Sequence, residues 1–157
     1  MYGSDYGMFG ALAAAGLFLG LLFFAIAIAA YVLTALGLYK LAQKQNFENA
    51  WLAWIPVAQF YIIGKIVGEA KFGTAFTIPR LELVLPLGAI AIGILGYIPV
   101  LGQLIALAYA VVCIYSLYLL YKKYVPDQAV LYTILSAVGL FAIFIFIIRD
   151  KDQVVSE

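Results

Sequence analysis

Apolar runs separated by short polar stretches organise this chain. The first run, residues 9–38, contains thirty positions without a charged side chain. About twenty apolar residues in an α-helix cross the hydrocarbon core of a bilayer, which is roughly 30 Å thick. The run therefore predicts a membrane-spanning helix that is tilted or that extends beyond the bilayer.

A second apolar segment lies within residues 49–68 and contains Pro56. Its most apolar part, residues 51–64, has fourteen residues, which is short for a full crossing. We expect a re-entrant or interfacial segment here. A complete crossing, which would raise the number of spans to five, stays open as the alternative.

Residues 83–121 form the longest apolar block, about twice the length of one span. The stretch from Gly96 to Gly102, with Pro99 inside it, divides this block near its middle. Proline removes a helical hydrogen bond and glycine tolerates turn geometry. Two spans, at 83–98 and 103–121, are therefore predicted.

The last run, residues 129–148, is twenty uncharged residues long, and Pro126 and Asp127 precede it. Proline and an acidic residue are common where a helix begins. We therefore expect one integral membrane domain over residues 1–157. Its fold class is all-α, a polytopic transmembrane helical bundle with four spans, at 9–38, 83–98, 103–121 and 129–148.

The composition supports this class, with 67% hydrophobic and 11% charged residues. A soluble domain has about 45–50% apolar and 25% charged residues, so a soluble fold could not cover this much apolar surface. A membrane β-barrel would require alternating apolar and polar positions, and residues 17–33 show no such alternation. Helices satisfy every backbone hydrogen bond internally and are therefore the expected spanning structure.

Basic residues give the expected orientation. If residues 49–68 re-enter, the four-span arrangement places seven basic residues on one side and the two of the C-terminal tail on the other. The positive-inside rule then favours a cytoplasmic side for the seven and an outer location for both termini. The five-span arrangement places four basic residues on one side and five on the other, and this near-equal count does not indicate an orientation.

Two pairs of segments resemble one another. Residues 38–55 and 117–134 match at a constant offset in both apolar and polar positions, which indicates a duplicated helix, loop and helix. An aromatic-Ile-Pro-Val sequence followed by glutamine also occurs twice. Proline-broken apolar segments can mark a transport site, although proline and glycine also simply end helices. The candidate ligand-binding or pore-lining residues are Trp54, Pro56, Gln59, Tyr97, Pro99 and Gln103.

Small residues four positions apart lie on one helix face and allow helices to approach closely in lipid. They indicate a packed bundle or an oligomer without choosing between the two. The pairs are Gly16 with Gly20, Ala25 with Ala29, Gly64 with Gly68, Ala89 with Gly93, and Ala106 with Ala110.

The chain offers few groups for chemistry. It has no histidine, its one cysteine is Cys113, and no acidic residue lies inside a predicted span. Catalysis needs a nucleophile with a base, paired carboxylates or metal ligands. We therefore expect no enzyme, cofactor, metal or nucleic-acid partner. The expected role is a self-associating or accessory subunit of a membrane complex, and the alternative is a small transporter or channel at the two helix breaks.

The stretch from Leu38-Tyr39-Lys40 to Trp51-Leu52-Ala53-Trp54-Ile55-Pro56 resembles a segment of small uncharacterised bacterial multi-pass membrane proteins. In these proteins a span ends in basic residues and a Trp-x-x-x-Ile-Pro segment follows. The resemblance covers about twenty residues. It implies a bacterial inner-membrane location and no activity.

Overall fold

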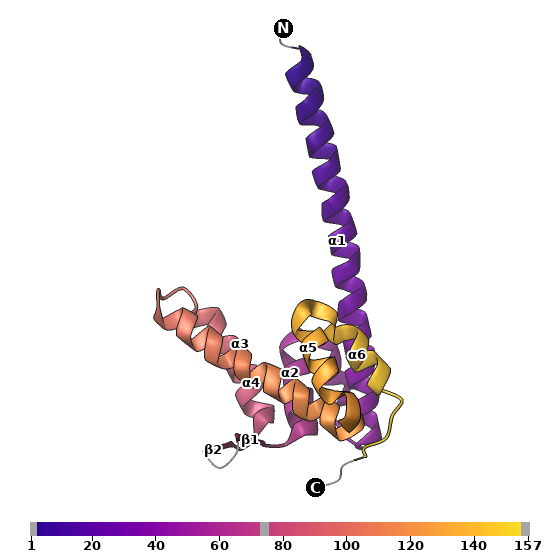
Figure 1. Ribbon diagram of the computed structural model, residues 1–157, viewed down its shortest axis with the longest axis vertical. Coiled ribbons are helices and arrows are strands. Elements are labelled where there is room, and N and C mark those ends of the chain that lie inside the picture. Colours follow the sequence, from indigo (N-terminus) through magenta and orange to yellow (C-terminus); the bar gives the residue numbers. More distant parts are fainter. Residues whose placement is uncertain (1–2, 73–75, 155–157) are drawn as a thin grey trace. The chain divides into compact units, whose positions relative to one another are not determined.

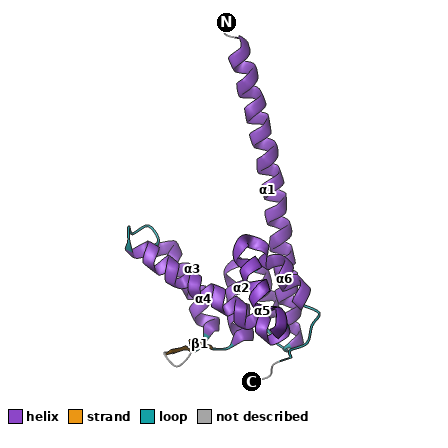
Figure 2. Cartoon of the chain, in the orientation of Figure 1, coloured by secondary structure: helices purple, strands orange, loops and turns teal. Residues whose placement is uncertain are grey.

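The computed structural model describes residues 3–72 and 76–154, and most of them are helical (Figures 1 and 2). The elements are α1 (Gly3–Lys44), η1 (Ala50–Trp54), α2 (Pro56–Val67), β1 (Ala70–Phe72), β2 (Phe76–Ile78), α3 (Leu81–Leu95), α4 (Leu101–Tyr124), η2 (Pro126–Gln128), α5 (Ala129–Leu135), η3 (Ser136–Leu140) and α6 (Phe141–Ile148). The predicted all-α class is confirmed. Within the described residues, the only strands are β1 and β2, which form a short antiparallel pair.

Three helical stretches in the described residues are long and apolar enough to cross a membrane: Gly7–Lys44, Leu101–Tyr124 and Pro126–Ile148. Helices α2 and α3 are apolar but shorter. This combination of length and hydropathy identifies an α-helical membrane protein.

The chain forms two units, Met1–Val32 and Leu33–Glu157. The first consists of the N-terminal part of α1, in which every residue from Gly7 to Ala29 is exposed. The second contains the remaining elements and a continuous apolar core.

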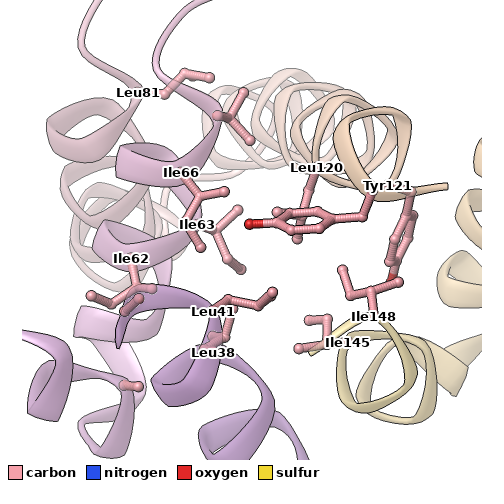
Figure 3. Packing of buried hydrophobic residues seen from close by; sticks show 14 of the residues in the cluster. Leu38, Leu41, Ile62, Ile63, Ile66, Leu81, Leu120, Tyr121, Ile145 and Ile148 are labelled. Atoms are coloured by element: carbon pink, nitrogen blue, oxygen red, sulfur yellow. The ribbon is translucent and has the colours of Figure 1, made fainter. Parts of the chain in front are cut away.

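The core of the second unit brings together the C-terminal part of α1 with α2, α4 and α6 (Figure 3). Leu38 and Leu41 of α1 are fully buried, as is Tyr121 of α4. Ile62 of α2 and Ile145 of α6 complete the same cluster. Segments far apart in the sequence therefore share one apolar core.

Glycines permit the closest helix contacts. A Cβ atom on Gly64 of α2 would overlap the backbone of Leu81 at the start of α3. Gly88 of α3 lies against the ring of Tyr109, whose hydroxyl donates a hydrogen bond to the Leu85 carbonyl oxygen at 2.7 Å. Gly64 belongs to one of the predicted small-residue pairs, whereas Gly88 belongs to none of them.

The other predicted packing positions make fewer contacts. Nothing within 4 Å would meet a Cβ atom on Gly16, Gly20 or Gly93. Ala89 and Ala106 are half-buried, and Ala110 is exposed.

The region expected to be the last span turns back on itself. Gly139 has a φ of 107° and separates α5 from α6. The rings of Tyr132 and Phe144 lie 4.4 Å apart between centroids. In a continuous helix, residues twelve positions apart would be about 18 Å apart along the axis. Residues 126–148 are therefore two short helices packed side by side (Figure 1), which differs from the single straight helix expected at 129–148.

The C-terminal tail returns to the polar end of α1. Lys40 forms an ion pair with Asp150, and Lys44 forms one with Asp152 at 2.9 Å. The backbone N–H of Val154 donates to the Lys123 carbonyl oxygen at 2.8 Å. The sequence placed the tail on the side opposite Lys40 and Lys44. In the structure, the turn at Gly139 instead brings the tail back beside them.

Residues 45–67 also leave this end of the unit and return to it. Pro56 is the first residue of α2 and follows the short helix η1. Near the end of α2, the Lys65 ammonium lies 4.6 Å from the centroid of the Phe47 ring. Lys123 donates to the Ile66 carbonyl oxygen at 3.2 Å. We call residues 45–67 and 126–148 the first and second reversing segments.

Candidate functional site: an apolar cavity

A cavity of about 250 Å³ lies inside the second unit. Five helices line it: the C-terminal part of α1, α2, α3, α4 and α6. Its lining is mostly apolar, and no charged residue takes part. The lining residues are Thr34, Gln59, Phe60, Ile63, Leu85, Cys113, Ser116, Leu117, Phe141 and Ile145.

The polar side chains of the lining are engaged with the protein. Gln59 donates from Nε2 to the Ala53 carbonyl oxygen at 3.0 Å. Ser116 donates to the Val112 carbonyl oxygen one helical turn earlier, at 2.7 Å. Among the described residues, no buried side-chain nitrogen or oxygen lacks a hydrogen-bond partner. The cavity therefore presents little free hydrogen-bonding capacity to a guest.

The tips of both reversing segments border the cavity. Gln59 lies in the first turn of α2, just after Pro56. Phe141 is the first residue of α6 and follows the break at Gly139. Residues that follow the two breaks therefore line the same cavity, although the breaks are far apart in the sequence.

The depth of the cavity follows from its lining helices. Thr34 precedes the end of α1 at Lys44 by ten residues, and Cys113 precedes the end of α4 at Tyr124 by eleven. At 1.5 Å per residue, both side chains lie about 15 Å from the polar ends of their helices. The first basic residues toward these ends, Lys40 and Lys122, lie about 9 Å and about 14 Å away along the helix axes, so both side chains lie within the half-thickness of a hydrocarbon core of roughly 30 Å.

Of the six candidate ligand-binding residues, Gln59 lines this cavity. Trp54 and Pro56 lie beside it in the chain but are exposed. The other three belong to the turn between α3 and α4 or to the start of α4. Tyr97 is 89% exposed, and Pro99 and Gln103 are also exposed. The two aromatic-Ile-Pro-Val segments therefore do not converge on one site.

Sequence reasoning did not find the remaining lining residues. Thr34, Leu85 and Phe141 lie in three different apolar runs and share no local motif. Gly139 was the available signal for the second break, because a glycine inside an apolar helix can mark a change of direction.

The described residues contain no group of three or more His, Cys, Asp or Glu side chains that could hold a metal ion. Comparison with protein-family models, with curated proteins and with solved structures gives no significant match. The function must therefore be inferred from the geometry of this chain.

Proposed function

We propose that this chain is a multi-pass, non-enzymatic subunit of a bacterial cell membrane that associates with itself or with a larger membrane complex. One observation carries the proposal: every residue of α1 from Gly7 to Ala29 is exposed, and the uncharged run to which most of them belong exceeds the thickness of a bilayer.

The thirty residues 9–38 form a helix about 45 Å long at 1.5 Å per residue. A hydrocarbon core of roughly 30 Å would cover this length only at a tilt near 50°, beyond the range of about 0–40° seen in membrane proteins. Lipid alone therefore leaves part of the apolar helix uncovered. Large exposed apolar surfaces commonly mark contacts with other proteins, and a second copy of α1 offers a matching surface.

The basic residues support a multi-pass topology with a single cytoplasmic end. Lys44 binds the tail, Lys123 binds the end of α2, and the Leu81 N–H at the start of α3 donates to the Gly68 carbonyl oxygen at 3.1 Å. These contacts join the segments that carry all the basic residues: Lys40, Lys44, Lys65, Lys71, Arg80, Lys122, Lys123, Arg149 and Lys151.

The positive-inside rule then favours three crossings, by α1, α3 and α4, with both reversing segments entering from the cytoplasmic side. In this topology the N-terminal end of α1 lies outside and the described part of the tail lies inside. A transport site formed by the breaks at Pro56 and Pro99 is not favoured, because only the segment that follows Pro56 contributes to the cavity.

Disulfide cross-linking in native membranes tests self-association. Gly16→Cys and Gly20→Cys, each in a Cys113→Ser background, place the thiol where nothing within 4 Å would obstruct it. Phe18→Cys, about 200° around the helix from Gly16, is the matched control. We expect a covalent dimer from the glycine positions and much less from Phe18. Monomer at all three positions, with no co-purifying membrane protein in mild detergent, would overturn the proposal.

A further inference from the structure

We infer that the cavity between α1, α2, α3, α4 and α6 binds one acyl chain of a membrane lipid. The first reason is chemical. The lining holds no charge, and Gln59 and Ser116 already donate to backbone carbonyl oxygens. Burying a polar guest without compensating hydrogen bonds is unfavourable, whereas apolar cavities of this kind accept hydrocarbon guests.

The second reason is position. Thr34 and Cys113 lie about 9 Å and about 14 Å along their helices from Lys40 and Lys122, the first basic residues toward the polar ends of α1 and α4, which places the cavity at the depth of the hydrocarbon core. Leu85, Ser116 and Ile145 are almost fully buried and form its inner wall, whereas Phe141 is 39% exposed. Phe141 is the most exposed of the lining residues, and we place the entrance for a lipid chain from the bilayer beside it.

The third reason is structural. The walls contributed by α2 and α6 each begin at a break in the chain, at Pro56 and after Gly139. A lipid that binds only the folded state stabilises that state by an amount that rises with the ratio of lipid concentration to Kd. An occupied cavity therefore holds the tips of both reversing segments in place.

Native mass spectrometry of the full chain in mild detergent provides the test. Cys113→Trp adds bulk to the lining, and Ala110→Trp adds the same bulk on an exposed position of the same helix. We expect one retained phospholipid on the wild type and on Ala110→Trp, and none on Cys113→Trp. Equal retention by all three proteins would overturn the inference.

A measurement on the wild type covers the case in which Cys113→Trp does not fold. Cys113 is the only cysteine in the chain and lines the cavity, so its alkylation by N-ethylmaleimide reports occupancy. Phosphatidylglycerol at about ten times its Kd should slow the reaction about tenfold relative to delipidated protein. An unchanged rate would overturn the inference, and protection by oleic acid without protection by phospholipid would overturn the assignment to a membrane lipid. Neither readout depends on self-association.

Discussion

The two reversing segments achieve the same change of direction through different sequences. In the first, a polar loop and Pro56 indicate the break in the sequence, and α2 begins at the proline. In the second, twenty uncharged residues run without proline or charge, and the chain turns at Gly139. The length of an apolar run therefore does not by itself predict how many times the chain crosses the membrane.

The contacts that hold the two reversals also differ. Polar and cationic groups stabilise the first: Gln59 donates to the Ala53 carbonyl oxygen, and Lys65 lies over Phe47. An aromatic cluster holds the second, in which the Tyr121 ring contacts both Tyr132 and Phe144 edge to face. The side chain of Tyr121 also forms a 2.7 Å hydrogen bond with Ser136. A reversal without polar markers thus depends on contacts with another helix, which a local pattern does not reveal.

The largest expected effect is the side of the membrane from which cysteines on either side of residues 126–148 are labelled, because it distinguishes a reversing segment from a crossing helix. Lys71→Cys, Lys122→Cys and Lys151→Cys, each in a Cys113→Ser background, should react with an impermeant thiol reagent from the same side of the membrane. Gly10→Cys serves as the control for the opposite side. If Lys122 and Lys151 were labelled from opposite sides, residues 126–148 would cross the membrane as one helix.

The next effect concerns the turn at Gly139. Alanine there must adopt a φ of 107°, which is unfavourable for an L-residue by about 1–2 kcal/mol. For a chain of this size, we expect Gly139→Ala to lower the melting temperature in detergent by about 2–8 °C. Gly93→Ala is the matched control, because Gly93 is helical and a Cβ atom there meets open space. Equal stability of the two variants would contradict the turn.

A smaller effect is expected at Pro56. Proline at the first position of a helix removes no intrahelical hydrogen bond, so Pro56→Ala changes mainly the entropy of the unfolded chain. We expect a loss of about 0.4–1 kcal/mol in unfolding free energy. Pro86→Ala, inside α3, restores a helical N–H and should be neutral or stabilising. If Pro56→Ala lost more unfolding free energy than Gly139→Ala, the first reversing segment would depend more on its proline than the second depends on its glycine.

The smallest effect involves the tail. The hydrogen bond from Lys40, followed by that from Arg149, lowers the pKa of the Asp150 carboxyl group. Because the folded-state pKa is lowered, the contact stabilises the docked tail at neutral pH and is lost as the pH falls through that value. Asp150→Asn should speed hydrogen exchange of residues 151–154 at neutral pH, most clearly at low salt. Identical exchange in the two proteins would rule out a role for this ion pair in docking.

The sequence predicts much of the local structure. Composition and the absence of alternating polar positions identify the helical membrane class, and Lys44 and Tyr124 end α1 and α4 close to the expected polar boundaries. The division between α3 and α4 falls within the expected stretch from Gly96 to Gly102. These features are local, because charge, proline and glycine act on the residues beside them.

The remaining features depend on contacts between distant segments. The cavity lining comes from five helices, and Gly88 matters because Tyr109 of the neighbouring helix lies against it. Thr34 and Ile145 meet at the cavity although they belong to opposite ends of the sequence. A single sequence records no such pairing, so the cavity could not be predicted, and Gly139 indicated a break without showing that α6 packs back on α5.

The ion pair between Lys40 and Asp150 has a kinetic consequence. These residues are 110 positions apart, whereas the hairpin of α3 and α4 closes over a few residues. Contacts of such long sequence separation form slowly, and this one can form only after α5 and α6 have packed. Interactions that arise after the transition state slow unfolding without speeding folding. Loss of the tail contact should therefore change the unfolding rate, modestly, and leave the folding rate nearly unchanged.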